Sequence, residues 1–207
     1  MGQPELGRPI INIEGERVAL GPLRRDLVPL YQRWINDFAS AHNFGQVGPL
    51  TEDQERAWYD RQATAEQSVT FTIYERATWR PIGTTNLHAL DHRNGTATFG
   101  VGIGEADCRG KGYGTEVTRL MLDYAFTALG LHSVMLIVFA YNLAGQRAYA
   151  KAGFREIGRR HQAYRLGGRW WDIVYMDCLA AEFTSASFLK YGVDQRTRRS
   201  YAISERL

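Results

Sequence analysis

Apolar residues recur along this chain with two different periods. Alternation at every second position, the pattern of a half-buried strand, marks segments 16–23 and 68–74. Segments 81–89, 96–103, 154–162 and 170–179, which turn residues separate, are predicted as further strands. A seventh segment, residues 133–139 (SVMLIVF), is continuously apolar, as expected of a strand buried on both faces. The pattern therefore predicts about seven strands.

A period near 3.6 predicts about four helices between these strands. We expect Asp26 to cap the first, whose apolar stripe is Leu27, Leu30, Tyr31, Trp34, Ile35 and Phe38. Thr51 and Gln54 have the spacing of a capping box and open the second, which runs to about Arg61. The third follows a glycine-rich turn and ends at Gly130, and the fourth covers 142–152.

The elements follow one another as strand, two helices, three strands, helix, strand, helix and two strands. This order predicts an α/β fold with a mixed sheet and helices packed on it. We find no internal repeat, so we expect residues 1–207 to form a single domain. Its core spans about 13–183, and 184–207 form a C-terminal extension that contains Arg196, Arg198 and Arg199.

Composition excludes several classes of protein. The formal net charge of +3 over 207 residues is far below the basic bias of nucleic-acid binders. No signal peptide begins the chain, and no apolar run approaches the length of a membrane span. The two cysteines, Cys108 and Cys178, lie far apart and lack metal-type spacing. We therefore expect a cytoplasmic protein without a metal, a membrane or a nucleic acid as partner.

The glycine-rich turn is the clearest chemical motif. Arg109-Gly110-Lys111-Gly112-Tyr113-Gly114 lies between a strand and a helix, where free N–H groups and the helix dipole attract anions. It is no P-loop, because that motif needs a Gly-Lys-Ser/Thr ending with four residues between its glycines, whereas here Tyr113 follows Gly112. The glycine spacing also excludes a dinucleotide fingerprint. Two alternatives stay open at this point: the Arg-x-x-Gly-x-Gly pattern of a phosphate site, and a helix start without a ligand.

With several further motifs in order, the chain resembles the GNAT superfamily of N-acetyltransferases. It is most similar to the branch of ribosomal-protein N-terminal acetyltransferases and spermidine acetyltransferases. The resemblance covers about residues 16–183 and rests on 34–37 (WIND), 82–84 (IGT), 109–116 (RGKGYGTE), 142, 148–149, 151–154 (KAGF), 168 and 172. It implies a mostly antiparallel sheet whose fourth and fifth strands splay apart.

The resemblance implies acetyl-CoA as co-substrate and places it along this turn. Backbone amides of Gly110, Gly112, Tyr113, Gly114 and Thr115 would hold the pyrophosphate, with Arg109 and Lys111 adding positive charge. Val101, Gly102 and Ile103 on the fourth strand would pair with the pantetheine arm as an added strand does, and Asn142 would bind it by its side-chain amide.

The resemblance also implies a general acid, Tyr149, which would protonate the departing thiolate. It lies seven residues after Asn142, two helical turns along the same face, and a phenol of pKa about 10 suits that transfer. The alternative is a core tyrosine. Where relatives carry a glutamate base this chain has Thr98, which cannot take a proton from an ammonium. His88, Asp91, ordered water or a neutral substrate are the alternatives.

Two other side chains near the turn are weaker candidates for a catalytic role. Glu105 fits a solvated turn acid at the outer edge of the coenzyme loop. Cys108 could act as a nucleophile, but the family transfers acetyl directly to the amine.

The acceptor is the least defined partner. Loop 41–50 and hairpin 165–171 should frame its pocket, with Trp170 and Trp171 either lining it or packing on the sheet. The sequence thus predicts acetyl transfer to the amine of a small molecule or a peptide N-terminus, by direct attack in a ternary complex of a monomer or homodimer. The alternative is a non-catalytic acyl-CoA sensor, which Tyr149 argues against and Thr98 favours.

Overall fold

The structure is a computed structural model that describes residues 8–46 and 48–184. Within these residues eight strands form one sheet in the order β1-β2-β3-β4-β5-β6-β8-β7. The strands are β1 (Ile13–Glu14), β2 (Val18–Pro22), β3 (Ser68–Glu75), β4 (Pro81–Asp91), β5 (Thr96–Ile103), β6 (Ser133–Phe139), β7 (Arg155–Leu166) and β8 (Arg169–Leu179). This mixed, mostly antiparallel sheet confirms the predicted fold class, with the short β1 as an additional strand.

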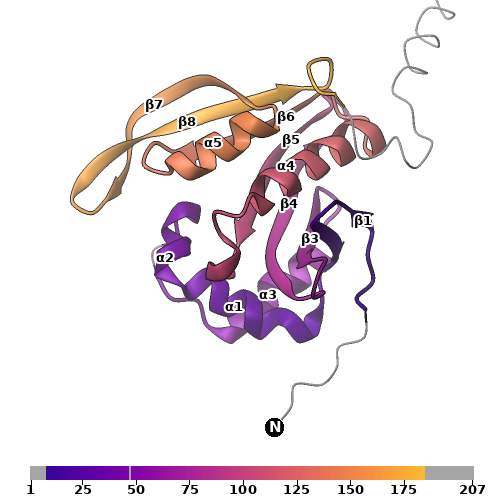
Figure 1. Cartoon of the computed structure of the whole chain (residues 1–207). Helices are drawn as coiled ribbons and strands as arrows, with labels where there is room; N and C mark the ends of the chain where they lie inside the picture. The colour runs from indigo at the N-terminus through magenta and orange to yellow at the C-terminus, as the bar shows by residue number, and fades with distance from the viewer. Residues whose placement is uncertain (1–7, 47, 185–207) are drawn as a thin grey trace, which may run out of the picture.

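Helices cover both faces of this sheet (Figure 1). They are α1 (Val28–Asn36), α2 (Phe38–Ala41), α3 (Glu52–Ala63), α4 (Tyr113–Asp123) and α5 (Leu143–Ala152). Strand β3 is buried on both sides as a result. Phe71 and Ile73 belong to the core shared with α4, whereas Tyr74 packs with α1 and the Thr72 hydroxyl lies 2.6 Å from that of Tyr31. Because successive side chains of a strand point to opposite faces of the sheet, β3 contributes residues to two separate apolar cores.

Strands β5 and β6 pair in parallel over only a short stretch and then separate. Only Thr96–Thr98 of β5 pair with Ser133–Met135 of β6. Beyond that point β5 continues along β4 to Ile103, while β6 continues along β8 to Phe139. The two strands therefore diverge, as the resemblance implied.

Two glycines at the end of β5 admit aromatic side chains from the helical layer. A Cβ atom at Gly102 would lie 2.6 Å from the ring of Phe44, and one at Gly104, just after the strand, would lie 2.2 Å from the ring of Trp34. Glycine here permits the close approach of these protein rings. Trp34 of α1 and Phe44, which follows α2, thereby lie against the end of β5.

The start of the first helix differs from the prediction. Asp26 lies in a 3₁₀ turn before α1 and pairs with Arg24 (2.5 Å), so it caps nothing, and α1 begins at Val28 without a side-chain cap. The helix also ends early, because Asp37 caps the separate helix α2. Phe38, expected on the buried stripe, is therefore 63% exposed.

Other local signals are confirmed. Thr51 and Gln54 form the predicted capping box at the start of α3. Helix α4 runs on through a π-helical turn (Tyr124–Ala128), and Gly130 follows with a φ of 69°, a conformation that favours glycine.

Glu116, in the first turn of α4, ties that helix to β2. Its carboxylate accepts hydrogen bonds from the backbone N–H of Arg17 (2.8 Å) and of Val18 (3.3 Å) and from Nε of Arg17 (3.1 Å). The Arg17 guanidinium in turn donates to the carbonyl of Lys111 (2.8 Å). This network therefore fixes the glycine-rich turn relative to β2 and the start of α4.

We predict that Glu116→Ala lowers the free energy of unfolding by about 1–3 kcal/mol, because it leaves the backbone N–H groups of Arg17 and of the buried Val18 without their acceptor. Urea denaturation measures this change. The matched control is Glu52→Ala on α3, which removes only an exposed pair with Arg56 and should change stability by less than about 0.5 kcal/mol. Equal losses in the two variants would contradict this role of Glu116.

Candidate active site

The divergence of β5 and β6 leaves a cleft of about 860 Å³. Its walls come from β5, β6, the turn before α4, and α5. It brings together the predicted residues His88, Thr98, Val101, Gly102, Ile103, Arg109, Gly110, Gly112, Tyr113, Gly114, Thr115, Asn142 and Tyr149. Lys111, also predicted to bind the coenzyme, is not among the described residues that line it.

The glycine-rich turn forms one end of the cleft and fits a phosphate group. Gly110 and Gly112 have positive φ values of 73° and 85°, and Gly112 stands at the N-cap of α4, where no side chain of the described residues caps the helix. A Cβ atom at Gly110 or Gly114 would meet nothing within 4 Å. The first N–H groups of α4 thus face open space at the positive end of the helix dipole.

Arg109 is anchored beside this turn. Its guanidinium donates to the carbonyls of Ile103 (3.1 Å) and Gly104 (2.6 Å) and to the carboxylate of Asp37 (3.0 Å). This contact with Arg109 is the main reason that the pKa of Asp37 lies below its usual range. Arg109 therefore joins the end of β5 to α2 as well as lining the cleft.

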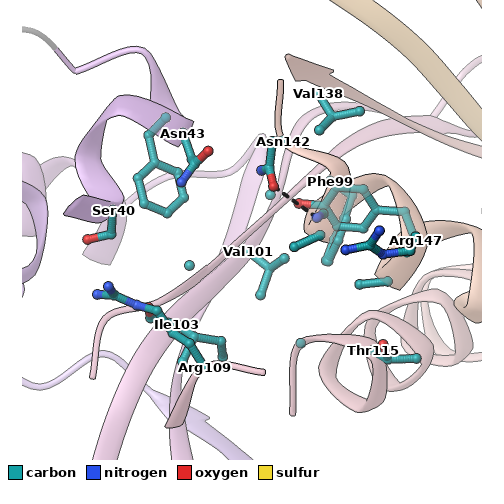
Figure 2. A pocket seen from close by; sticks show the side chains of 18 of the residues that line it. Ser40, Asn43, Phe99, Val101, Ile103, Arg109, Thr115, Val138, Asn142 and Arg147 are labelled. Carbon is teal, nitrogen blue, oxygen red and sulfur yellow. Dashed lines mark hydrogen bonds between the residues drawn. The ribbon is translucent and has the colours of Figure 1, made fainter. Parts of the chain in front are cut away.

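Asn142 caps α5 where β6 leaves the sheet. Its Oδ1 accepts a hydrogen bond from the N–H of Gly145 at 2.9 Å, the dashed line in Figure 2. The Nδ2 group remains as a donor for a ligand in the cleft. Across the cleft, Ser40 and Asn43 lie on the side opposite Arg147 and Thr115 (Figure 2).

Tyr149 lies deeper on the same helix. Its ring packs edge-on against Phe99 (6.2 Å between centroids) and Phe154 (6.2 Å). Burial raises the pKa of Tyr149 to about 12. The phenol is therefore protonated at neutral pH and can donate a proton.

Thr98 and His88 are direct neighbours across β5 and β4. Residues opposite each other in an antiparallel pair have side chains on the same face, and both line the cleft. Desolvation lowers the pKa of His88, so the imidazole is neutral at pH 7. A group able to accept a proton thus lies beside Thr98.

Comparisons with known proteins agree with this geometry. A family model described as an acetyltransferase (GNAT) domain matches residues 17–155. The chain belongs to the GNAT acetyltransferase family. A probable N-acetyltransferase of Bacillus subtilis, YjcK, is 35% identical over 129 residues, 62% of this chain and 67% of that protein.

Two further relatives are more distant. The human alpha/beta-tubulin-N-acetyltransferase 9 is 28% identical over 69% of this chain and 74% of its own length. The crystal structure of spermidine N-acetyltransferase from Vibrio cholerae in complex with CoA and spermine has the same fold, with a TM-score of 0.75 and 22% identity. It covers 81% of this chain and 98% of that one.

This GNAT chain is therefore an acetyl-CoA-dependent N-acetyltransferase, and the predicted activity is confirmed over the sensor alternative. The residues of the cleft fit the coenzyme, since the open glycine turn suits its pyrophosphate and the gap between two strands suits an extended arm.

Two other groups considered as chemical participants have structural partners. The carboxylate of Asp91 binds the backbone and side chain of Asn94 (2.9 and 2.6 Å). Glu105, expected to be solvated, accepts from the indole N–H of Trp34 (2.8 Å) and pairs with Arg33. Both carboxylates thus hold turns in place.

Cys108 lines the cleft but is 1% exposed. Its burial raises the pKa of the thiol, which disfavours the thiolate that a nucleophile needs. Its position therefore argues against an acyl-cysteine intermediate.

The acceptor side matches the prediction in part. Asn43 and Phe44, from loop 41–50, line the cleft, whereas Trp170 and Trp171 are absent from the described residues that line it. Trp171 packs edge-on against Tyr141 (5.3 Å), and Trp170 is 59% exposed. Arg196, Arg198 and Arg199 lie outside the described residues.

Sequence reasoning missed Arg147 and Ser40, which also line the cleft. Arg147 lies on the helix that joins Asn142 to Tyr149, so its charge and position were a usable signal. The sequence around Ser40 carries no signal of this kind, because only the break between α1 and α2 brings that residue to the cleft.

In the described residues no group of three or more His, Cys, Asp or Glu side chains could hold a metal ion. None of the helices of residues 8–46 and 48–184 has the length and apolar character needed to cross a membrane.

We predict that Gly114→Ala weakens CoA binding about tenfold or more, because a methyl group there obstructs hydrogen bonds from the turn to the pyrophosphate. The fold should persist, since this Cβ meets no protein atom within 4 Å and alanine favours a helix. Isothermal titration with CoA and thermal denaturation measure the two effects. Gly158→Ala on β7, equally open but outside the cleft, is the control. Unchanged CoA affinity in Gly114→Ala would show that the turn does not hold the coenzyme.

Proposed function

We propose that this GNAT enzyme acetylates a primary amine of a small organic molecule by direct attack, with both substrates bound in the cleft. Acetyl-CoA supplies the acetyl thioester. The observation that carries the proposal is that Tyr149, Asn142, the glycine turn and the open edge of β5 line one cleft. The N–H groups of residues 110–115 and the amide of Asn142 bind the coenzyme, and a backbone N–H near Val101 or Gly102 holds the developing oxyanion.

Proton transfers in this mechanism involve two side chains. His88, neutral because desolvation lowers its pKa, accepts the proton of the acceptor ammonium, directly or through one water. Tyr149 gives its phenolic proton to the departing thiolate. Thr98 takes no proton and lies beside His88 on the paired strands β5 and β4.

A small amine is favoured by the fold neighbour from Vibrio cholerae, a spermidine N-acetyltransferase in complex with CoA and spermine. The second candidate acceptor is an amine of a protein or peptide, which the human alpha/beta-tubulin-N-acetyltransferase 9 relative favours because its name specifies a protein substrate. We further propose a cytoplasmic location, because Cys108 and Cys178 are both free thiols. The predicted monomer or homodimer stays a prediction.

We predict that the protein releases free CoA thiol from acetyl-CoA when monoamines, diamines or peptides with free N-termini are added.

We also predict that Tyr149→Phe lowers kcat about 10²–10⁴-fold. The KM of this variant for acetyl-CoA should stay within about threefold of the wild-type value, because the phenolic oxygen acts only as the thiolate departs. Thiol release measures both parameters. Tyr141→Phe, which removes a phenol that donates to the carbonyl of His42, is the matched control. Full turnover in Tyr149→Phe would remove Tyr149 from the acid role.

The pH dependence of kcat tests the role of His88. We predict that kcat at saturating substrates falls as pH decreases through a pKa below about 6.5, because protonated His88 accepts no proton. No loss due to Tyr149 should occur on the alkaline side below about pH 11, since its pKa is about 12. In His88→Gln kcat should be lower and its acidic limb absent. An identical acidic limb in this variant would assign the titration to another group.

A further inference from the structure

A second cavity, of about 560 Å³, lies beneath α1 and α3. It shares Ser40, Phe44 and Gly102 with the acetyl-transfer cleft, so the two cavities adjoin near the C-terminal end of β5. Phe44, 48% exposed, lies over Gly102 where they meet. A molecule in the second cavity would therefore reach the cleft by passing this ring.

Glu55 is the unusual residue of the second cavity. It lines the wall from the first turn of α3 and is 5% exposed. Among the described residues no hydrogen bond or ion pair joins its carboxylate to another group, although Arg61 lines the same cavity. Glu52, by contrast, pairs with Arg56 on the exposed side of the same helix (2.6 Å).

An unpaired carboxylate in a buried wall is energetically costly, and burial raises the pKa of Glu55. Buried polar groups in folded proteins nearly always have a partner. Since the side chain borders a cavity, the missing partner is best supplied by a ligand. A cation with N–H donors satisfies both its charge and its oxygens.

The other walls fit an organic cation. Tyr31, Trp34 and Trp58 form an aromatic group in which Tyr31 lies 5.8 Å from Trp34 and 6.0 Å from Trp58. The hydroxyl of Tyr31 and the indole N–H of Trp34 already have partners in Thr72 and Glu105, so these residues offer ring faces. Aromatic faces beside a carboxylate bind ammonium groups by cation–π and charge interactions.

We propose that this second pocket binds a non-reacting ammonium group of the acceptor, with Glu55 as its counter-charge, while another amine of the same molecule reaches the cleft past Phe44. The acceptor is then a diamine with an apolar linker. This inference rests on the proposed function and specifies the class of amine.

Steady-state kinetics with matched acceptors test the proposal. Diaminohexane and hexylamine have the same linker but differ in the second ammonium. Glu55→Gln should lower kcat/KM for diaminohexane about tenfold or more, and change kcat/KM for hexylamine and the KM for acetyl-CoA by less than about twofold. Glu52→Gln should change none of these values. Equal effects on both amines, or none on diaminohexane, would overturn the proposal.

A binding measurement separates this pocket from acetyl transfer. Trp34 and Trp58 line the pocket, so their fluorescence reports on its occupation without acetyl-CoA. In the wild-type protein, hexylamine and diaminohexane should bind at least about tenfold more tightly than hexanol, and Glu55→Gln should abolish that preference. The wild-type comparison needs no variant to fold, and equal binding of hexanol would overturn the proposal. Amine binding without any thiol release would support the pocket and contradict the proposed function.

Discussion

Strands β5 and β6 run side by side for three residues and then part, and the site depends on this separation. Parallel strands normally satisfy each other's backbone groups along their length. Here the edge of β5 beyond Thr98 and the edge of β6 beyond Met135 face a cleft, where an extended ligand can take the place of the missing strand. The glycine turn before α4 and the start of α5 lie at this opening because each follows directly from one of the parted strands.

The two sides of the cleft are built in different ways. The side that we propose for the coenzyme consists mostly of backbone: positive-φ glycines, the first N–H groups of α4 and the strand edge of β5. The side that we propose for the acceptor consists of side chains carried by α1, α2 and α3 and by Phe44, with Phe44 and Trp34 lying against Gly102 and Gly104. Backbone contacts suit acetyl-CoA, the acetyl donor, which is the same in every reaction of the family. A pocket made of side chains can change by substitution to fit different acceptor amines.

This contrast explains what could be predicted from the sequence. Alternation identified β3 to β5, the capping box marked α3, and the glycine spacing marked the turn, because each signal is local. Asp26 failed as a cap because Arg24, two residues away, pairs with its carboxylate. Glu105 was mistaken for a solvated acid because its partners, Arg33 and Trp34, lie about 70 residues earlier in the chain and come close only in the fold. The Glu55 pocket is likewise invisible in sequence, where that residue resembles any acid in a first helical turn.

The central claim is that the parted strands and the glycine turn hold acetyl-CoA for direct transfer. A crystal structure of the protein with bound CoA tests it most directly. The account predicts the pyrophosphate within hydrogen-bond distance of N–H groups between Gly110 and Thr115, the pantetheine arm between β5 and β6, and the sulfur near the Tyr149 hydroxyl. CoA bound elsewhere, or its sulfur distant from Tyr149, would contradict it.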